Sequence, residues 1–377
     1  MDPKPANGFA DIVPMHACVS RLCDFQLKGG AVMRLERESV VFESMDMNFV
    51  KKHGLMAATD MVLDYKADHQ TPFLYDLRQL AYFLEIPQDQ LRRLLADVGA
   101  YYRTACIPKR SGGFRTLSIP LSPLREVQKD ILSGVLYLLP GSEHATAYHP
   151  GDCLRRNAVP HVSKRCLLKL DITDFFGSIT AELVKNVFAA AGYNDEIADV
   201  LTALCCLDNA LPQGACTSPA MSNLVMKHFD DAFGGWCRVR HFTYTRYCDD
   251  ITVSGDAEVY PAYRKAKYML GRMGFEINRK KTRFITNASR QTVTGLTVNE
   301  KIAVPSDYRR RLRQELYYVD RFGIRGAAEH LHIDDAERYF QSLMGRLNYV
   351  LSVDPLNDYF FEAEERLRRQ LTQLRGE

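Results

Sequence analysis

The chain has 377 residues, a formal net charge of +3, and a composition that is 46% hydrophobic and 25% charged. These ordinary globular values exclude a low-complexity or fibrous protein and allow two or three subdomains. No stretch approaches the roughly 20 apolar residues that cross a bilayer, and no signal peptide is evident, so we expect a cytoplasmic protein without a membrane partner. Ten scattered cysteines without a CxxC pair favour neither a zinc site nor a disulfide framework.

The N-terminal region lacks a clear pattern. We expect an extension of unknown role over residues 1–72, with a strand pair at Val32–Leu35 and Ser39–Phe42. Pro72 separates this extension from the remainder of the chain, which is strongly patterned. The extension supports no functional assignment of its own.

Helices and strands then follow without regular alternation, which predicts an α+β fold. The expected helices are Asp76–Phe83, Gln88–Val98, Leu124–Leu139, Ala181–Ala191, a helix within Gly214–Phe233, Ala257–Met273, and a mainly helical region from Ser306 onward. The expected strands are a hairpin over Ile107–Pro120, then Cys166–Ile172, Phe242–Tyr247, Ile251–Ser254, Phe275–Asn278, and a second hairpin that joins Val293–Val298 to Ile302–Val304.

Three aspartates stand at strand ends. Asp171 closes an apolar strand, and Asp249 and Asp250 form the turn between two further strands. Neighbouring carboxylates repel and are costly to bury unless cations neutralise them, and hard oxygen ligands suit Mg²⁺. Two such ions can serve an in-line displacement at phosphorus. The alternative is that Asp249 and Asp250 are ordinary turn residues, since aspartate is common in turns.

At this point the chain resembles the reverse transcriptases, motif by motif. Asp171 is followed by Asp174-Phe175-Phe176, as the family's first catalytic aspartate is followed by paired aromatics. The other matching motifs are Gln213-Gly214-Ala215-Cys216-Thr217-Ser218-Pro219, Tyr247-Cys248-Asp249-Asp250, and Gly274-Phe275 through Asn278-Arg279-Lys280-Lys281-Thr282.

The resemblance implies a right-hand polymerase with Asp171, Asp249 and Asp250 as catalytic residues. Two Mg²⁺ ions would be held by Asp171, Ile172, Asp249 and Asp250. The expected dNTP-binding residues are Lys109, Arg115, Asp174, Phe176, Gln213 and Lys281. The first two lie around the glycine-rich turn of a basic hairpin that is suited to clamp phosphates. The alternatives are a core role for one or both of Phe175 and Phe176, and an ordinary surface role for Lys281.

Two short elements resemble the signatures of retron reverse transcriptases. They are Asn157-Ala158-Val159-Pro160-His161 and Val293-Thr294-Gly295. Such enzymes copy a structured non-coding RNA into DNA that stays attached to it (msDNA), priming from a 2′-hydroxyl of an internal guanosine. Many act in antiphage defence with a separately encoded effector protein. The chain departs from the family at Tyr148-His149, where Gly-Phe is common.

Basic residues gather in three runs, around Arg103–Arg115, Arg264–Arg283 and Arg309–Arg313. Runs that flank one acidic centre favour nucleic-acid binding, although any single run is more often a solvated helix face. The expected RNA-binding residues are Asn157, His161, Arg309, Arg310 and Arg313. The third run would grip the phosphate backbone independently of sequence.

The implied domains are the 1–72 extension, fingers with part of the palm over 73–165, the palm with part of the fingers over 166–298, and a mainly helical thumb over 299–377. Two other functions stay open. One is a different prokaryotic reverse transcriptase, group II intron-like or defence-associated. The other is a catalytically silent RNA-binding scaffold, which the presence of all three aspartates disfavours.

Overall fold

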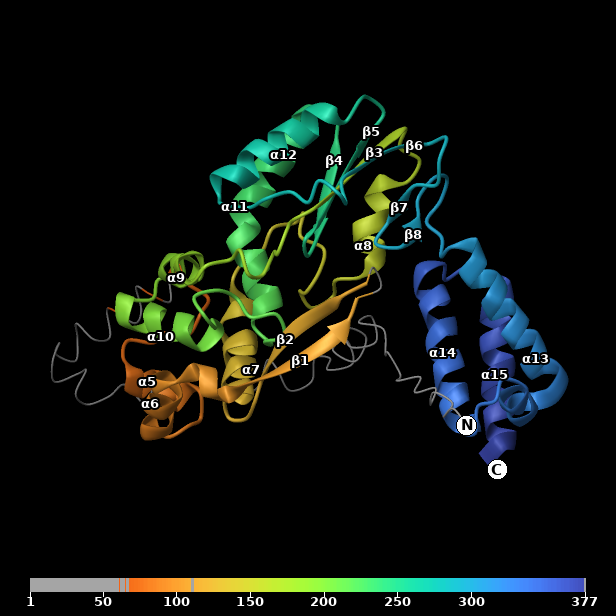
Figure 1. Ribbon diagram of the computed structural model, residues 1–377, viewed down its shortest axis with the longest axis horizontal. Helices are drawn as coiled ribbons and strands as arrows, with labels where there is room; N and C mark the ends of the chain where they lie inside the picture. Colours follow the sequence, from red (N-terminus) through yellow and green to blue (C-terminus); the bar gives the residue numbers. More distant parts are fainter. Residues whose placement is uncertain (1–60, 62–64, 66–67, 110–111, 376–377) are drawn as a thin grey trace, which may run out of the picture. The chain divides into compact units, whose positions relative to one another are not determined.

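The computed structural model describes Met61, Tyr65 and residues 68–109 and 112–375, with side chains up to Gln370. The strand pair expected at 32–42 lies outside these residues. The chain divides into two compact units, and the boundary between them falls between Ile302 and Ala303. Figure 1 gives the labels of the elements.

The first unit is built around a four-stranded antiparallel sheet in the order β4-β5-β3-β6. Its strands are β3 (Cys166–Asp171), β4 (Thr243–Tyr247), β5 (Asp250–Gly255) and β6 (Arg283–Thr286). The two central strands are buried along almost their whole length, whereas edge strand β6 is mostly exposed. A sheet buried on both faces needs strands that are apolar along nearly their whole length. Strand β3 meets this need with the buried residues Leu167, Leu168 and Leu170.

Helices supply the rest of this core. The first-unit helices are α5 (Leu77–Phe83), α6 (Gln88–Ala96), α7 (Leu124–Gly134), α8 (Leu154–Ala158), α9 (Ala181–Ala190), α10 (Asp195–Cys205), α11 (Ser218–Val239) and α12 (Tyr260–Arg272). Short 3₁₀ turns lie at η1 (Val98–Tyr101), η2 (Leu136–Leu138) and η3 (Val159–His161). Helix α11 contacts both β4 and α12. Side-chain caps fix the N-terminal ends of several of these helices. At the start of α10, the Asn194 side chain accepts a hydrogen bond from the backbone N–H of Ile197 at 2.9 Å.

Two hairpins extend from the first unit. Strands β1 (Tyr102–Pro108) and β2 (Phe114–Pro120) pair over their full length, and most of their side chains are exposed. Strands β7 (Thr292–Val293) and β8 (Leu296–Thr297) form a much shorter pair around Thr294-Gly295, which both adopt positive φ. The first hairpin confirms the sequence prediction and begins earlier than expected.

The described part of the second unit is a bundle of three helices, α13 (Ser306–His330), α14 (Ala336–Val353) and α15 (Asp358–Arg375). All three helices contact one another. Arg346 of α14 forms a two-pronged ion pair with Glu315 of α13, with N–O distances of 2.5 and 2.7 Å. Gly323 interrupts α13 with a φ of +71°, a conformation that glycine adopts without strain. The helical region expected from Ser306 is confirmed.

Three sequence predictions were wrong in detail. Phe275–Asn278 is not a strand, because only Ile277 forms a bridge, to Ile172, and the fourth strand is β6 instead. Ile302–Val304 does not pair with Val293–Val298, since β7 pairs with β8 within that segment. The helix expected to reach Leu139 ends at Gly134. Within the described residues, no helix has the length and apolarity to cross a bilayer.

Candidate active site

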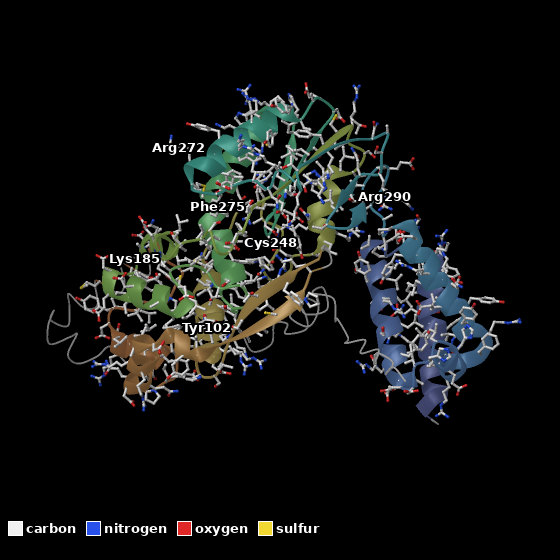
Figure 2. All side chains as sticks on the ribbon, viewed as in Figure 1. Tyr102, Lys185, Cys248, Arg272, Phe275 and Arg290 are labelled. Carbon is white, nitrogen blue, oxygen red and sulfur yellow. The ribbon has the colours of Figure 1, made fainter. Side chains whose placement is uncertain are left out.

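Strand register brings the three aspartates together. Asp171, the last residue of β3, lies directly opposite Asp250, the first residue of β5. Asp249 occupies the turn between β4 and β5, and its carbonyl accepts a hydrogen bond from the N–H of Ile172 at 3.1 Å. Residues on adjacent antiparallel strands are neighbours, so the end of β3 and the β4–β5 turn form one acidic edge. Cys248, labelled near the centre of Figure 2, lies in this turn.

Cys248 has a structural role in the turn. Its φ of +60° places it in the left-handed region, and its side chain is buried. Burial raises the pKa of the Cys248 thiol to about 12, so the thiol stays protonated and unreactive near neutral pH. Cys248 is therefore a residue of the turn and not a nucleophile.

The acidic edge carries more negative charge than its neighbours balance. Burial raises the pKa of Asp250 to about 6, and the charges of Asp249 and Asp171 add to the effect, while Lys169 opposes it. Burial and the nearby Asp171 also raise the pKa of Asp249. Such shifts report carboxylates that lack sufficient positive partners. The site therefore favours the binding of added cations.

Lys281 is the one cation that contacts these carboxylates among the described residues. Its Nζ lies 2.7 Å from Oδ2 of Asp171, and this hydrogen bond raises the pKa of the lysine. Two backbone hydrogen bonds hold Lys281 close to Asp171. The N–H of Asn278 donates to the carbonyl of Asp171 at 2.8 Å, and the N–H of Lys281 donates to the carbonyl of Asn278 at 3.1 Å. The side chain is 61% exposed, so Lys281 can move from Asp171 toward a ligand.

The donor set fits magnesium. Carboxylate oxygens and a backbone carbonyl at residue 172 are hard ligands of the kind Mg²⁺ prefers. No group of three His, Cys, Asp or Glu side chains in the described part of the chain forms a ready-made cage. Magnesium characteristically keeps waters and substrate phosphates as ligands, so a site that fills together with a triphosphate does not require such a cage.

The Gln213-Gly214 loop is fastened to the β1–β2 hairpin. The carbonyl of Gln213 accepts a hydrogen bond from the N–H of Ser118 at 2.8 Å. Gly214 has a φ of +126°, and a Cβ there would lie 2.7 Å from the Ser118 carbonyl oxygen, so only glycine fits. The hydroxyl of Ser218 closes the loop by donating to the carbonyl of Pro212 at 2.7 Å. These contacts leave the Gln213 side chain half-buried beside the start of α11.

The residues after Asp171 divide between core and surface. Phe175 is buried, and its ring lies 6.1 Å from that of Phe275, whereas Phe176 is half-buried. Phe175 is thus a core residue, and Phe176 retains exposed surface for a ligand. Asp174 is exposed with a φ of +43°. A Cβ at Gly177 would lie 2.4 Å from Asp174 Oδ2, so the glycine makes room for this carboxylate.

The predicted phosphate clamp is exposed and close to the hairpin turn. Lys109 follows β1, and its N–H donates to the carbonyl of Gly113 at 2.9 Å. Arg115 lies in β2 opposite Ile107. Both side chains are exposed. The turn between them gains its shape from Gly112 and Gly113, which both have positive φ.

The prediction that Asn157 and His161 bind RNA is not supported, because both side chains are buried behind the sheet. The His161 ring lies 2.6 Å from Ser254 Oγ through Nδ1 and 2.8 Å from Thr245 Oγ1 through Nε2. Thr245 also donates to Asn157 Oδ1 at 2.6 Å. Burial lowers the pKa of His161 to about 3, so the ring is neutral. These residues brace β4 and β5 and offer no side-chain surface to RNA.

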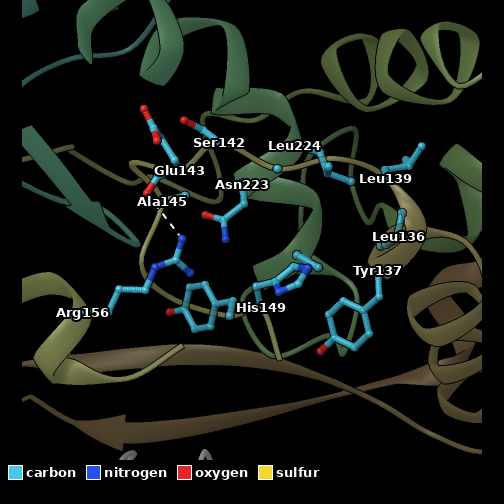
Figure 3. Close-up of a pocket in the computed structure, with 13 residues that line it drawn as sticks. Leu136, Tyr137, Leu139, Ser142, Glu143, Ala145, His149, Arg156, Asn223 and Leu224 are labelled. Carbon is cyan, nitrogen blue, oxygen red and sulfur yellow. Dashed lines mark hydrogen bonds between the residues drawn. The ribbon is translucent and has the colours of Figure 1, made fainter. Parts of the chain in front are cut away.

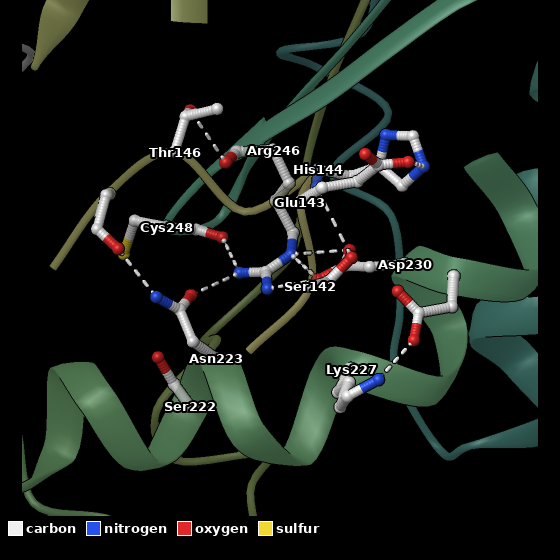
Figure 4. Close-up of polar contacts among 12 residues, drawn as sticks. Ser142, Glu143, His144, Thr146, Ser222, Asn223, Lys227, Asp230, Arg246 and Cys248 are labelled. Carbon is white, nitrogen blue, oxygen red and sulfur yellow. Dashed lines mark hydrogen bonds and ion pairs between the residues drawn. The ribbon is translucent and has the colours of Figure 1, made fainter. Parts of the chain in front are cut away.

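A buried ion pair supports the turn that carries Asp249 and Asp250, and sequence reasoning missed it. Figure 4 shows Arg246, which is fully buried, between Asp230 of α11 and the turn. Its Nε and Nη2 donate to the two Asp230 oxygens at 2.9 and 2.5 Å. Its Nη1 donates to the carbonyl of Cys248 at 2.9 Å and to Asn223 Oδ1 at 3.1 Å. Arg246 therefore fixes the residue that directly precedes Asp249.

Further contacts stabilise the charges of Arg246 and Asp230. Tyr244 donates its hydroxyl to Asp230 Oδ1 at 2.6 Å. Burial opposes the charged form of Arg246, but Asp230 stabilises the guanidinium and raises its pKa. A signal for this pair exists in the sequence, because an arginine in the middle of the strand Thr243–Tyr247 needs a charged partner if that strand is buried.

A cavity of about 380 Å³ lies beside this network and not at the aspartates. Figure 3 shows Tyr137, His149, Arg156 and Asn223 among its lining residues, with Arg156 donating to the Glu143 carbonyl. The adjoining Tyr148 has a φ of +71°, a conformation that favours glycine. Glycine, which the family resemblance implies at this position, would adopt this backbone angle without strain.

The predicted thumb arginines lie at the start of α13 in different settings. Arg310 is exposed and Arg309 is half-buried. The Arg313 guanidinium lies 5.2 Å from the ring centres of both Tyr359 and Phe360 of α15. Arg313 therefore also stabilises the bundle.

Comparisons with known proteins agree with these features. Residues 107–299 match the family model described as reverse transcriptase (RNA-dependent DNA polymerase). The chain is 33% identical to the retron Mx65 reverse transcriptase of Myxococcus xanthus, over 77% of this chain and 66% of that protein. It is 31% identical to the retron Ec86 reverse transcriptase of Escherichia coli, over 75% of this chain and 86% of that protein.

The matched segment contains the end of β1, all of β2, the glutamine-glycine loop and all three aspartates. The two relatives are both named as retron enzymes, and they are similar to this chain over about three quarters of its length. The chain belongs to the retron-type reverse transcriptases, which are RNA-directed DNA polymerases with the right-hand fold.

Proposed function

We propose that this chain copies part of a structured non-coding RNA into single-stranded DNA that stays linked to the RNA. The observation that carries the catalytic part is the register of β3 and β5, which sets Asp171 against Asp250 beside the Asp249 turn. The raised pKa values of Asp249 and Asp250 support a site built for cations. The retron relatives support the choice of template and product.

Two magnesium ions are the proposed cofactor, with Asp171, Asp249 and the carbonyl of Ile172 as ligands and Asp250 as a further candidate. When bound, they would activate the attacking hydroxyl and stabilise the leaving pyrophosphate. The protein's own part is to hold the carboxylates in place. The hydrogen bond from Ile172 to Asp249 and that from Arg246 to Cys248 do so from two sides.

The other predicted site residues would bind the incoming dNTP. Lys109 and Arg115 are exposed at the hairpin, where they can contact triphosphate oxygens. The half-buried Gln213 and Phe176 and the exposed Asp174 would contact the nucleotide. Lys281, freed from Asp171, would neutralise the departing pyrophosphate. In this assignment 73–165 holds the fingers and part of the palm, 166–298 the palm and part of the fingers, and 299–377 the thumb. The unit boundary at Ile302 supports a thumb that starts near there.

Priming is proposed to use a 2′-hydroxyl of an internal guanosine of the RNA. The hydroxyl oxygen bonds to the α-phosphorus of the first dNTP as the bond to pyrophosphate breaks, which leaves a branched RNA–DNA molecule. We further propose a role in antiphage defence with a separately encoded effector protein. Arg309 and Arg310 at the start of α13 are the proposed contacts to the RNA backbone.

The test is to express the chain with its flanking genomic region and to extract the nucleic acids. The expected product is a DNA that becomes shorter on RNase treatment but survives it. The double variant Asp249→Asn/Asp250→Asn should contain none, whereas Asp334→Asn, at an exposed loop aspartate, should contain the normal amount. A wild-type chain that extends primers in vitro but yields no RNA-linked DNA would contradict the retron function alone.

A further inference from the structure

Helix α12 presents a face of alternating rings and cations to solvent. Tyr260, Arg264, Tyr268 and Arg272 are spaced four residues apart, and all four are exposed. Residues at this spacing lie on one side of a helix and about 6 Å apart along its axis. The opposite side of α12 buries Ala262, Ala266 and Leu270 in the core. The alternation is therefore a property of the outward side alone, and its C-terminal member, Arg272, is labelled in Figure 2.

Neighbouring side chains extend this face, which we call the α12 face. It comprises Tyr260, Tyr263, Arg264, Lys267, Tyr268 and Arg272, which line a shallow hollow. Phe284 of β6 adds a ring 6.0 Å from Tyr260 and 5.8 Å from Tyr263. Tyr260, Tyr268 and Phe284 are 48%, 60% and 50% exposed, which is unusual for large rings.

The cations of the α12 face are not neutralised. Among the described residues, none of Arg264, Lys267 and Arg272 forms an ion pair, and α12 itself contains no acidic residue. The contacts that exist are with rings, since Lys265 Nζ lies 5.9 Å from the centre of the Tyr268 ring and Arg272 approaches the Tyr268 hydroxyl at 3.5 Å. A solvated helix face of ordinary composition would mix both signs of charge.

We propose that the α12 face binds an unpaired segment of RNA, a contact separate from the catalytic aspartates. Exposed rings stack on bases, and interleaved cations bind the phosphates between them, which is how single strands are held without sequence preference. RNA is favoured as the occupant because the structured RNA of the proposed function, on which this inference rests, contains unpaired loops. A protein partner is disfavoured, since the rings are separated by charges and form no broad apolar patch.

The first experiment measures binding of a labelled 12-nucleotide oligo(U) RNA to the full chain, whose polymerase cleft is first saturated with a primed RNA–DNA duplex. Tyr268→Ala should weaken binding by about 5- to 100-fold, because one base loses its stacking partner. Arg264→Ala/Lys267→Ala should weaken it by tenfold or more and lower the slope of log K against log salt by about 1.4. Both changes introduce alanine, the residue with the highest helix propensity, at exposed positions, so α12 should stay folded.

The matched control is Arg92→Ala/Arg93→Ala, which removes two exposed arginines from α6, and it should bind oligo(U) like the wild type. Primer extension on a generic primed RNA should change less than twofold in every one of these variants. Ultraviolet crosslinking of 4-thiouridine-labelled oligo(U) should mark the peptide that contains Tyr260–Arg272.

The proposal is overturned if oligo(U) does not bind the cleft-saturated wild type, or binds the α12 variants equally well. It is also overturned if the variants lose a co-purifying protein while their RNA affinity is unchanged, because the face would then dock a protein. One further result would distinguish failure of this proposal from failure of the proposed function. If no variant or wild type synthesises DNA but oligo(U) binding still depends on the α12 face, only the proposed function fails.

Discussion

Two charged regions lie at the β4–β5 hairpin, and they differ in whether their charges are neutralised. At the hairpin's turn, Asp249 and Asp250 lie beside Asp171, and Lys281 is the one cation among the described residues that contacts these carboxylates. Behind the turn, Arg246 and Asp230 are both fully buried and satisfy each other with three hydrogen bonds. The front region retains unbalanced charge that a ligand can neutralise. The rear region is closed and serves to hold the front in place.

This contrast separates function from support within a few residues of sequence. Carboxylates with raised pKa values in an accessible edge are typical of catalytic sites. A matched buried pair is typical of a structural element, and losing one partner leaves an uncompensated charge. The His161 cluster belongs with the rear region, since its polar atoms face Ser254 and Thr245.

The largest expected effect on stability comes from breaking the rear pair. Asp230→Asn should lower the free energy of unfolding by about 3–5 kcal/mol, because Arg246 would keep its charge without a buried counter-ion. Its neighbour Asp231 pairs with Lys227 on the surface, so Asp231→Asn should cost less than about 1 kcal/mol. Urea unfolding of both variants measures the difference. Equal losses would refute the assignment of Arg246–Asp230 as the support of the turn.

A smaller effect is expected where the glutamine-glycine loop meets β2. Gly214→Ala should destabilise the chain by about 1–3 kcal/mol, since its φ of +126° and the Ser118 carbonyl both exclude a Cβ. Gly235→Ala, in α11 with open space around it, should be neutral or slightly stabilising. Thermal unfolding compares the two. A neutral Gly214→Ala would show that the loop is not fastened as described.

The smallest effect concerns pH. Because the folded pKa of His161 is about 3, the unfolded chain takes up a proton near pH 6.5 that the folded chain does not, so stability falls as the pH falls. This group should contribute a loss of about 1 kcal/mol between pH 6.5 and 5.5. His161→Gln should remove that part of the slope in urea unfolding, and the exposed His228→Gln should not. An unchanged slope in His161→Gln would indicate that the ring is not buried and neutral.

The sequence predicted the front region better than the rear. Asp171, Asp249 and Asp250 could be brought together because a strand end and a strand–turn–strand pattern are local signals. Asn157 and His161 were misjudged, since burial behind a sheet depends on tertiary packing that no local pattern reveals. Phe275–Asn278 alternates like a strand, yet the strand is β6, whose exposed edge position leaves no clear alternation.

The missed elements have similar causes. Helix α10, which begins at Asp195 only a few residues after α9 ends, is absent from the elements expected from the sequence. The charge of Arg246 within a buried strand requires a partner, but no local pattern identifies Asp230, which lies in a different element, as that partner. The roles of residues in the thumb depend on its placement against nucleic acid, which sequence patterns do not define.

The most direct test of the central claim is single-nucleotide incorporation on a primed RNA template with Mg²⁺, comparing Asp249→Asn with Asp334→Asn. If the aspartate edge is the polymerase centre, Asp249→Asn should lower the incorporation rate by at least about 100-fold, the scale on which loss of one electrostatic stabiliser acts. Its unfolding free energy should stay near that of the wild type, and Asp334→Asn should incorporate normally. Near-normal incorporation by a folded Asp249→Asn chain would contradict the account.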